Sequence, residues 1–324
     1  MPRGIMVATL ATSRASNHTT AMKKIIIIGP CRMDIIMPAD TTPGAPITWM
    51  PGSALQNSAI ILAQSGAPVW MVSEVARDAT GSLLCRSLES AGVNIQCIDR
   101  VSNGEHTSTA IFFRSETAVS PIIYSSEPDE RFNASWPRID PGDVVLFGSP
   151  ELLKPRAHQF MSDLLDHIAD RNAIAVYAPL LTPYEVPRIT RATPVILEFM
   201  ERADITLLTP TDTTMLFTDT EAEKCYNEHV RFYCPTMVYF NEATHTLSIH
   251  HHKLQATAPV QLPSHTLIWQ AGAISALATA LERLDISRPE PGDMLSFSIE
   301  QLQAMASIIA DGADNAAQTS VINH

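Results

Sequence analysis

The chain has 324 residues, with 22 Lys plus Arg against 34 Asp plus Glu, which gives a formal net charge of −12. This excess of acid argues against a general nucleic-acid-binding protein, because such proteins need a basic face to displace counterions. Hydrophobic residues make up 45% of the chain, so the composition favours a folded protein with a sizeable core. No apolar run approaches the roughly 20 residues that span a bilayer, and we expect no membrane segment.

The five cysteines contain no C-x-x-C pair, which favours reduced thiols in the cytoplasm over a disulfide framework or a zinc site. Residues 1–21 contain two Arg and no acidic residue. One interpretation of this stretch is a weak targeting peptide. We favour the other, in which residues 1–21 are disordered or precede the true start, so that the folded protein begins at Met22.

Short apolar runs alternate with helical patterns along most of the chain. The predicted strands are Ile25–Ile28, Val69–Val72, Val144–Phe147, Ile174–Tyr177, Ile205–Leu208 and Met237–Phe240. The predicted helices include Ala54–Ser65, Gly81–Ala91 and Pro155–Arg171. Continuous apolar runs are typical of strands buried on both faces. Alternation of strand and helix therefore predicts an α/β fold with a mostly parallel sheet flanked by helices.

Two segments break this rhythm, because apolar and polar residues alternate in them. These are Asp34–Met50 and Thr107–Tyr124, both rich in Thr, Ile and Phe. Alternation indicates antiparallel strands. Both segments connect to the first half of the sheet, and we expect them to form a small β flap over one edge.

Polar residues near the first predicted strand form one candidate site. Asp34 follows that strand, and ligands of open parallel sheets lie beyond the carboxyl ends of the strands. Its carboxylate would accept two sugar hydroxyls, although a solvated turn Asp is an equally good interpretation. Gly52 lets the backbone approach a ligand closely, and Asn57 lies in the first turns of the next helix. For Asn57 the alternative is a helix cap or a surface amide.

A second candidate site is the start of the helix within Leu267–Leu281, which is apolar almost throughout. Ala271, Gly272 and Ala273 open this helix, and the free N–H groups of a helix start attract phosphate. The alternative is that these small residues merely allow tight packing of helices.

The order of these features resembles the ribokinase-like (pfkB) family of carbohydrate kinases. That family has an Asp after strand one, followed by a G-G-x-x-x-N-x-A-x-x-L-A-x-L-G stretch and then V-G-x-V-G-x-D-x-x-G. Here Asp34 is followed by Pro51–Gly66 and Val72–Gly81, which leads to A-G-V-N at Ala91–Asn94. The resemblance covers roughly Lys23 to Ala317.

The resemblance implies a doubly wound α/β domain over residues 22–324, with a small β-sheet lid from about 34–50 and 107–124. It also implies transfer of a phosphoryl group from ATP, with Mg²⁺, to a sugar or nucleoside hydroxyl. By the same resemblance the sugar is held by Asp34, Gly52 and Asn57, and the anion hole is formed by Gln270, Ala271, Gly272 and Ala273. The lid closes over the sugar and pairs two subunits, so that we expect a homodimer.

The chain differs from the family motifs at the positions of the catalytic base, the magnesium shell and the nucleotide. The family's G-A-G-D falls on Gln270–Ala273, so Ala273 stands at the position of the catalytic base. The N-x-x-E motif of the magnesium shell falls on Thr209–Asp212, of which only the acid at Asp212 remains. The T-L-G motif near the nucleotide ends at Asn241. We therefore expect ATP and Mg²⁺ to bind weakly or not at all.

No acidic residue lies between Glu242 and Glu282, so no carboxylate of that stretch replaces the base. His265 is a conceivable substitute, which we do not favour. His250 and His252 suggest a metal site, because alternate residues of a strand share a face. No acid flanks them, and we expect a solvated strand and no metal.

Three functions remain open. We favour a noncatalytic or strongly impaired pseudokinase of the sugar-kinase family that binds a sugar or nucleoside, chiefly because of Ala273. The first alternative is an active, divergent carbohydrate kinase with a base from elsewhere. The second is a structural or regulatory subunit without a ligand, against which Asp34 and Asn57 argue by keeping the family register.

Overall fold

The computed structural model describes residues 23–38, 44–102, 105–114, 119–125, 132, 134–261, 269–290 and 292–322. Residues 1–21, for which we predict disorder or a misplaced start, lie outside them. A nine-stranded sheet organises the described residues, in the order β13-β12-β11-β10-β9-β8-β1-β4-β5. Its strands are β1 (Ile25–Ile28), β4 (Val69–Ala76), β5 (Asn94–Val101), β8 (Val144–Gly148), β9 (Ile174–Ala178), β10 (Ile205–Leu208), β11 (Thr236–Asn241), β12 (Thr246–His251) and β13 (Leu254–Pro259).

The strands from β5 across to β11 are parallel, and β12 and β13 add antiparallel strands at one edge. Strand β1 lies inside the sheet, between β4 and β8. All four of its isoleucines are buried, as a strand covered on both faces requires. The apolar runs of the sequence therefore correctly predict the buried strands.

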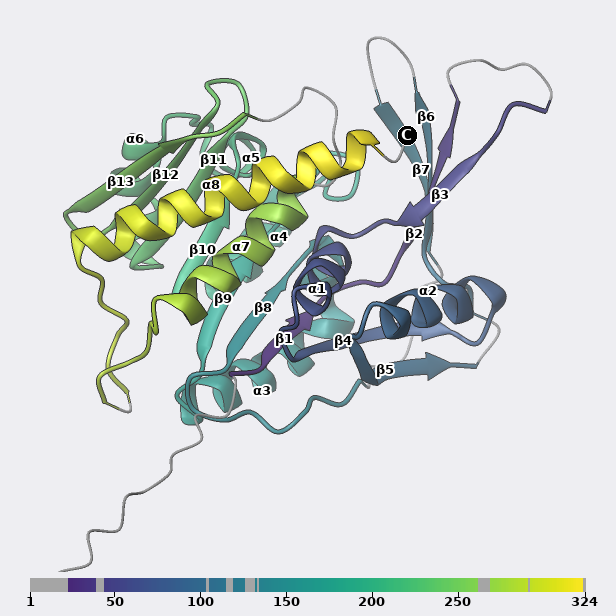
Figure 1. Ribbon diagram of the computed structural model, residues 1–324, viewed down its shortest axis with the longest axis horizontal. Coiled ribbons are helices and arrows are strands. Elements are labelled where there is room, and N and C mark those ends of the chain that lie inside the picture. The colour runs from purple at the N-terminus through teal and green to yellow at the C-terminus, as the bar shows by residue number, and fades with distance from the viewer. Residues whose placement is uncertain are drawn as a thin grey trace, which may run out of the picture.

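Helices cover both faces of the sheet and make three layers (Figure 1). Ile25 and Ile27 belong to the core under one helical layer, and Ile26 and Ile28 to the core under the other. The first layer holds α1 (Ala54–Gln64), α2 (Ala79–Ser90), α7 (Trp269–Arg283) and α8 (Ile299–Ile322). The second holds α3 (Pro155–Asp170), α4 (Ile189–Glu201), α5 (Pro210–Phe217) and α6 (Ala222–Glu228), with the short 3₁₀ turns η1 (Pro150–Leu153) and η2 (Val230–Phe232).

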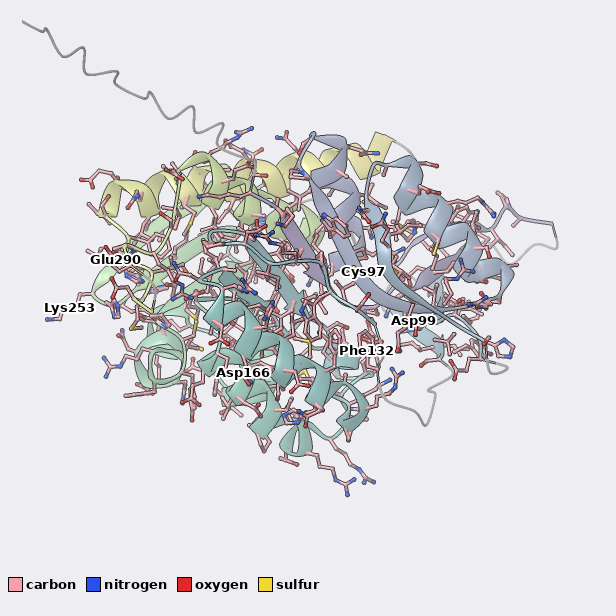
Figure 2. The ribbon with its side chains drawn as sticks, turned by 90° about the horizontal axis from the view of Figure 1, so that it is seen from below. Cys97, Asp99, Phe132, Asp166, Lys253 and Glu290 are labelled. Atoms are coloured by element: carbon pink, nitrogen blue, oxygen red, sulfur yellow. The ribbon has the colours of Figure 1, made fainter. Side chains whose placement is uncertain are left out.

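The view along the sheet places α8 along one side of the molecule and α3, which carries Asp166, along the other (Figure 2). This is the α/β fold that the sequence predicts, with helices on both faces of a mostly parallel sheet. No helix in the described ranges is long and apolar enough to cross a membrane.

A separate four-stranded sheet stands beside the carboxyl end of β1 (Figure 1). Its order is β3 (Thr48–Pro51), β2 (Met33–Met37), β6 (Thr109–Arg114) and β7 (Val119–Tyr124). The outer pairs are antiparallel, as the alternating segments predict, whereas the central pair β2 and β6 is parallel. The chain passes from β1 into this small sheet within Gly29–Arg32, which brings β2 to the carboxyl edge of the large sheet.

Candidate functional site

Asp34 lies on β2 at the base of the small sheet and is 3% exposed. The adjacent Gly52 has room only for a hydrogen, because a Cβ at that position would lie 1.9 Å from Asp34 Oδ1. The Gly52 amide also donates to the Arg32 carbonyl at 2.8 Å. The carboxylate and the glycine that the sequence assigns to the sugar site therefore lie together, and the glycine is needed for the position of the carboxylate.

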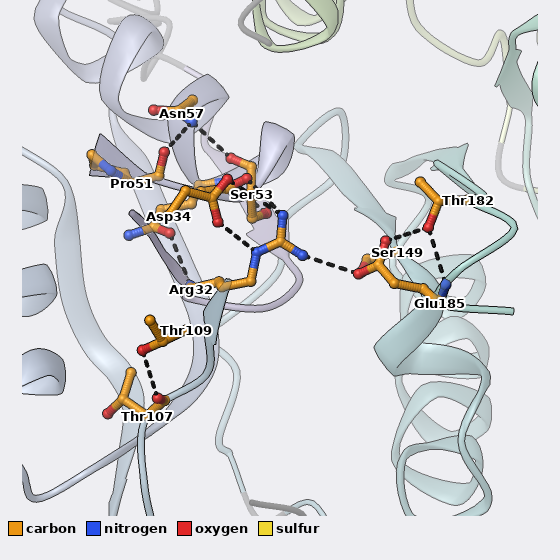
Figure 3. A network of polar contacts seen from close by, with 12 residues as sticks. Arg32, Asp34, Pro51, Ser53, Asn57, Thr107, Thr109, Ser149, Thr182 and Glu185 are labelled. Carbon is orange, nitrogen blue, oxygen red and sulfur yellow. Dashed lines mark hydrogen bonds and ion pairs between the residues drawn. The ribbon is translucent and has the colours of Figure 1, made fainter. Parts of the chain in front are cut away.

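The guanidinium of Arg32 occupies the space in front of Asp34 (Figure 3). Its Nε donates to Asp34 Oδ1 at 2.8 Å, and Nη2 lies 3.5 Å from Oδ2. Nη2 also donates to the Gly52 carbonyl at 3.2 Å, and Nη1 to Glu185 Oε1 at 3.0 Å. Neither Arg32 nor Glu185 is predicted from the sequence as a site residue. One local signal could have found Arg32: it lies two residues before Asp34 in an extended segment, and alternate residues of such a segment share a face.

Glu185 belongs to the loop that follows β9, at the same edge of the large sheet. Thr182 Oγ1 donates to its other oxygen, Oε2, at 2.6 Å, which fixes the carboxylate toward Arg32. Burial raises the pKa of Glu185, the neighbouring Glu151 raises it further, and Arg32 opposes both. Burial likewise raises the pKa of Asp34 against the opposing charge of Arg32. The cluster thus holds two carboxylates, Asp34 and Glu185, on one guanidinium.

Asn57 points back into the turn that precedes its own helix. Its Nδ2 donates to the carbonyls of Pro51 at 2.9 Å and Ser53 at 3.1 Å (Figure 3). The Ser53 side chain caps α1 by accepting from the Gln56 amide. Asn57 therefore braces the Gly52 turn, and the structure brings it into the same neighbourhood as Asp34.

The start of α7, where the sequence places the anion hole, is packed against α8. A Cβ at Gly272 would lie 2.5 Å from Ala316 Cβ and 2.7 Å from the Gly312 carbonyl oxygen. Ala273 is fully buried. These small residues therefore allow α7 and α8 to pack closely. This is the alternative that the sequence leaves open.

The α7 start also contacts α1. Ser58 Oγ lies 3.1 Å from the Ala271 carbonyl and 2.7 Å from the Ala54 carbonyl, so its single proton serves these two acceptors. The contact places the α7 side of the site next to the helix that carries Asn57. His265, the conceivable substitute base, and Leu267 lie outside the described residues.

Thr209 and Asp212, assigned by resemblance to the magnesium region, form a capping box at the start of α5. Asp212 Oδ2 accepts from the Thr209 amide at 2.8 Å and from its hydroxyl at 2.7 Å, and Oδ1 accepts from the Leu181 amide at 2.8 Å. Burial raises the pKa of Asp212 to about 6 despite these bonds. Both oxygens of this carboxylate are therefore engaged in holding the backbone.

Asn241 lies at the β11–β12 turn, where its Oδ1 accepts from the amides of Ala243 and Thr244, each at 3.1 Å. Mg²⁺ prefers free carboxylate and water oxygens in octahedral geometry, and Asp212 and Asn241 use theirs within the fold. A helix start attracts phosphate through open N–H groups, and α8 packs on Gly272. Asp212 and Asn241, with these oxygens engaged, do not fit Mg²⁺.

The histidine segment is not the solvated strand that the sequence predicts. His250 and His251 are each 3% exposed, because α6 and α8 both pack against β12. Strand β12 ends at His251, and His252 lies in a turn with a positive φ of 51°. His250 and His252 therefore do not share a strand face. His251 Nδ1 lies 2.9 Å from Thr236 Oγ1, and burial lowers its pKa to about 4.

Among the described residues one other cluster has the composition of a metal site. It consists of Asp219, Glu228 and His229, whose ligand atoms lie within 4.8 Å of one another. Lys224 Nζ lies 2.8 Å from Asp219 Oδ2 and neutralises it, and Asp219 also accepts from two backbone amides. Asp219 is therefore satisfied within the protein.

Comparison with known proteins identifies the family to which the chain belongs. Residues 22–230 match the model of the pfkB family carbohydrate kinases. The chain therefore belongs to this family, whose members phosphorylate carbohydrates and use ATP and a divalent metal ion. The match ends before β11 and α7, the part of the chain that carries Asn241 and Ala273.

Ribokinase of Bacillus subtilis (strain 168) is 28% identical over 116 residues. The match covers 34% of this chain and 39% of that ribokinase. Among solved structures, aminoimidazole riboside kinase from Salmonella enterica, complexed with aminoimidazole riboside and an ATP analogue, superposes with a TM-score of 0.72 at 14% identity, covering 91% of this chain and 93% of that one.

Fructokinase from Vibrio cholerae O395, in apo form, superposes with a TM-score of 0.71 at 14% identity, covering 94% of this chain and 99% of that one. An uncharacterized sugar kinase from Pyrococcus horikoshii in complex with ATP gives 0.70 at 15% identity, covering 93% and 97%. These likenesses establish the ribokinase-like fold.

Proposed function

We propose that this carbohydrate-kinase family member is a pseudokinase, noncatalytic or strongly impaired in phosphoryl transfer, which keeps a place for a sugar or nucleoside. The observation that carries the proposal is Ala273, a buried methyl group at the position that the resemblance assigns to the catalytic base. Asp34, Gly52 and Asn57, to which the resemblance assigns the sugar, lie close together, which supports a retained binding role.

The expected loss of rate is large. A general base contributes on the order of 10²–10⁴ in rate, and in phosphoryl transfer positioning and electrostatics supply most of the remainder. Asp212 holds the Leu181 and Thr209 amides in place of a metal ion. Loss of the base together with the metal shell costs more than either loss alone.

The test is a transfer assay with radiolabelled ATP, Mg²⁺ and a panel of sugars and nucleosides, with Bacillus subtilis ribokinase as positive control. We expect no product above the spontaneous background. Turnover near the ribokinase rate would overturn the proposal, provided that an Asp34→Ala variant, purified in parallel, loses it. Equal activity in that variant would identify a contaminating kinase.

One observation favours the alternative of an active, divergent kinase. Glu242, at the carboxyl end of β11, lies close enough to Asp212 for its charge to raise the pKa of that residue. Two neighbouring carboxylates are a metal-binding combination. A Glu242→Gln variant distinguishes the two proposals, because it would reduce a metal-dependent turnover and change nothing in a pseudokinase.

The outer face of the small sheet supports a homodimer. Ile35, Trp49, Ile111 and Ile122 stand in one row across the four strands. Trp49 and Ile122 are 44% and 46% exposed, and such contiguous apolar surface marks interaction sites. We expect sedimentation to show a dimer that Ile122→Lys dissociates.

The five free, buried cysteines fit a reducing compartment such as the cytoplasm.

A further inference from the structure

We propose that Arg32 is an internal ligand of the sugar site, and that it keeps neutral sugars and nucleosides from Asp34. This inference rests on the proposed function for the location of the site. It adds a specificity-determining residue to which the family resemblance assigns no role. The consequence is that the chain binds neutral polyols weakly for as long as its own guanidinium remains in place.

The hydrogen-bonding capacity of Asp34 is already used within the chain. An ionised carboxylate only accepts hydrogen bonds, and a sugar presents hydroxyl donors to it. Arg32 Nε and Nη2 already face the two oxygens of Asp34, at 2.8 Å and 3.5 Å. Donor and acceptor are both charged in this pair, whereas a hydroxyl brings no charge of its own to the same carboxylate. A hydroxyl must therefore replace a stronger donor at the same oxygens.

Arg32 is held from three directions. Nη2 also donates to the Gly52 carbonyl, and Nη1 donates to Glu185. Thr182 fixes the far oxygen of Glu185. Removal of the guanidinium would leave two buried carboxylates without a counterion, which is strongly unfavourable. The equilibrium therefore favours the occupied state.

The charge of a competing ligand matters as well. Glu151 is close enough to influence both Arg32 and Glu185 electrostatically. Asp34 and Glu185 together offset the single charge of Arg32, so the guanidinium is not left over to attract an anionic ligand. Loss of Arg32, with its partner charge removed, should open the site to neutral polyols.

The experiment is calorimetric titration of D-ribose, D-fructose and adenosine, without nucleotide, into the wild type and the Arg32→Ala/Glu185→Gln variant. The double variant removes the guanidinium and one of the charges it balances, which protects folding. If its folding fails by circular dichroism, Arg32→Gln/Glu185→Gln, which keeps polar groups at both positions, takes its place. We expect at least a tenfold lower Kd for one of the three ligands.

The matched control is Arg288→Ala/Asp204→Asn. It removes another buried pair, with Arg288 Nη2 at 2.7 Å from Asp204 Oδ1, at the opposite end of the strands. We expect this control to bind as the wild type does. Addition of Asp34→Ala to the Arg32 variant should abolish the gained binding, because Asp34 is the acceptor that Arg32 releases.

Three results would overturn the role of Arg32: wild-type binding as tight as that of the variant, no binding by the folded variant, or gained binding that survives Asp34→Ala. These results are separate from the transfer assay. Tight wild-type binding without turnover refutes the Arg32 proposal and spares the pseudokinase. Turnover with weak binding that improves in the variant does the reverse.

Discussion

The two sides of the candidate site differ in what has become of their functional groups. On the small-sheet side lie Asp34 and Gly52, which we propose for the sugar, and their polar partners come from within the chain. On the α7 side, Ala273 offers a methyl group and Gly272 packs against α8. The masking that we propose on the small-sheet side is relieved by removing Arg32 together with one of its counter-charges, whereas Ala273 on the α7 side has no titratable group to uncover.

The strongest test of the masked side is the stability of Arg32→Ala. Removal of one partner of a buried ion pair leaves an uncompensated charge and costs about 3–5 kcal/mol. We expect urea denaturation to show a loss of this size in the free energy of unfolding. The Arg32→Ala/Glu185→Gln variant should recover part of it. A loss below about 1 kcal/mol would mean that the Asp34–Arg32–Glu185 network is solvated and no barrier to ligands.

The second prediction concerns pH and the far end of the sheet. Burial and the adjacent His252 lower the pKa of His251 from 6.5 to about 4. The unfolded chain therefore takes up a proton before the folded chain does, and stability present above pH 6.5 is lost as the pH falls toward 4. The difference amounts to about 3 kcal/mol.

We expect His251→Gln to remove this part of the acid dependence when unfolding is measured between pH 4 and 7. The exposed His245 is the matched control, and His245→Asn should leave the wild-type pH profile unchanged. An unaltered profile in His251→Gln would show that His251 titrates normally and is open to solvent.

Part of this comparison is visible in the sequence. Continuous apolar runs identify β1, β8, β9 and β10 because burial on both faces is a local property of each segment. The spacing of Asp34, Gly52 and Asn57 predicts one neighbourhood, because a strand and the following helix meet at the edge of a sheet.

The rest depends on long-range contacts. Arg32 and Glu185 are 153 positions apart, and no periodicity joins them. The sequence around His250 and His251 alternates apolar and polar residues, as in a half-exposed strand. Both histidines are nevertheless buried, because α6 and α8, which lie elsewhere in the chain, cover β12. The Leu181 amide that donates to Asp212 is 31 positions away along the chain.

On the α7 side, Gly272→Ala tests whether packing has replaced anion binding. The added Cβ meets Ala316 and the α8 backbone at under 3 Å, and overpacking of this kind costs about 1–3 kcal/mol. We expect a lower melting temperature. Equal or greater stability, as the helix propensity of Ala alone would give, would indicate an open helix start with room for a phosphate.

The smallest expected effect is that of Asn241→Ala, which removes the acceptor for two turn amides. We expect a loss of about 0.5–1 kcal/mol in the free energy of unfolding. Asn241→Asp retains a side-chain oxygen acceptor and should stay close to the wild type. If both variants match the wild type in stability, Asn241 is not held by its turn and is available to a ligand.

We propose that the α7 side does not hold the phosphoryl donor, and equilibrium titration of Mg–ATP into the wild-type protein measures this binding itself. We expect a Kd no tighter than about 1 mM, equivalent to roughly −4 kcal/mol. A Kd in the micromolar range would contradict it, because Gly272, Asp212 and Asn241 would then have to release their present partners to hold the nucleotide.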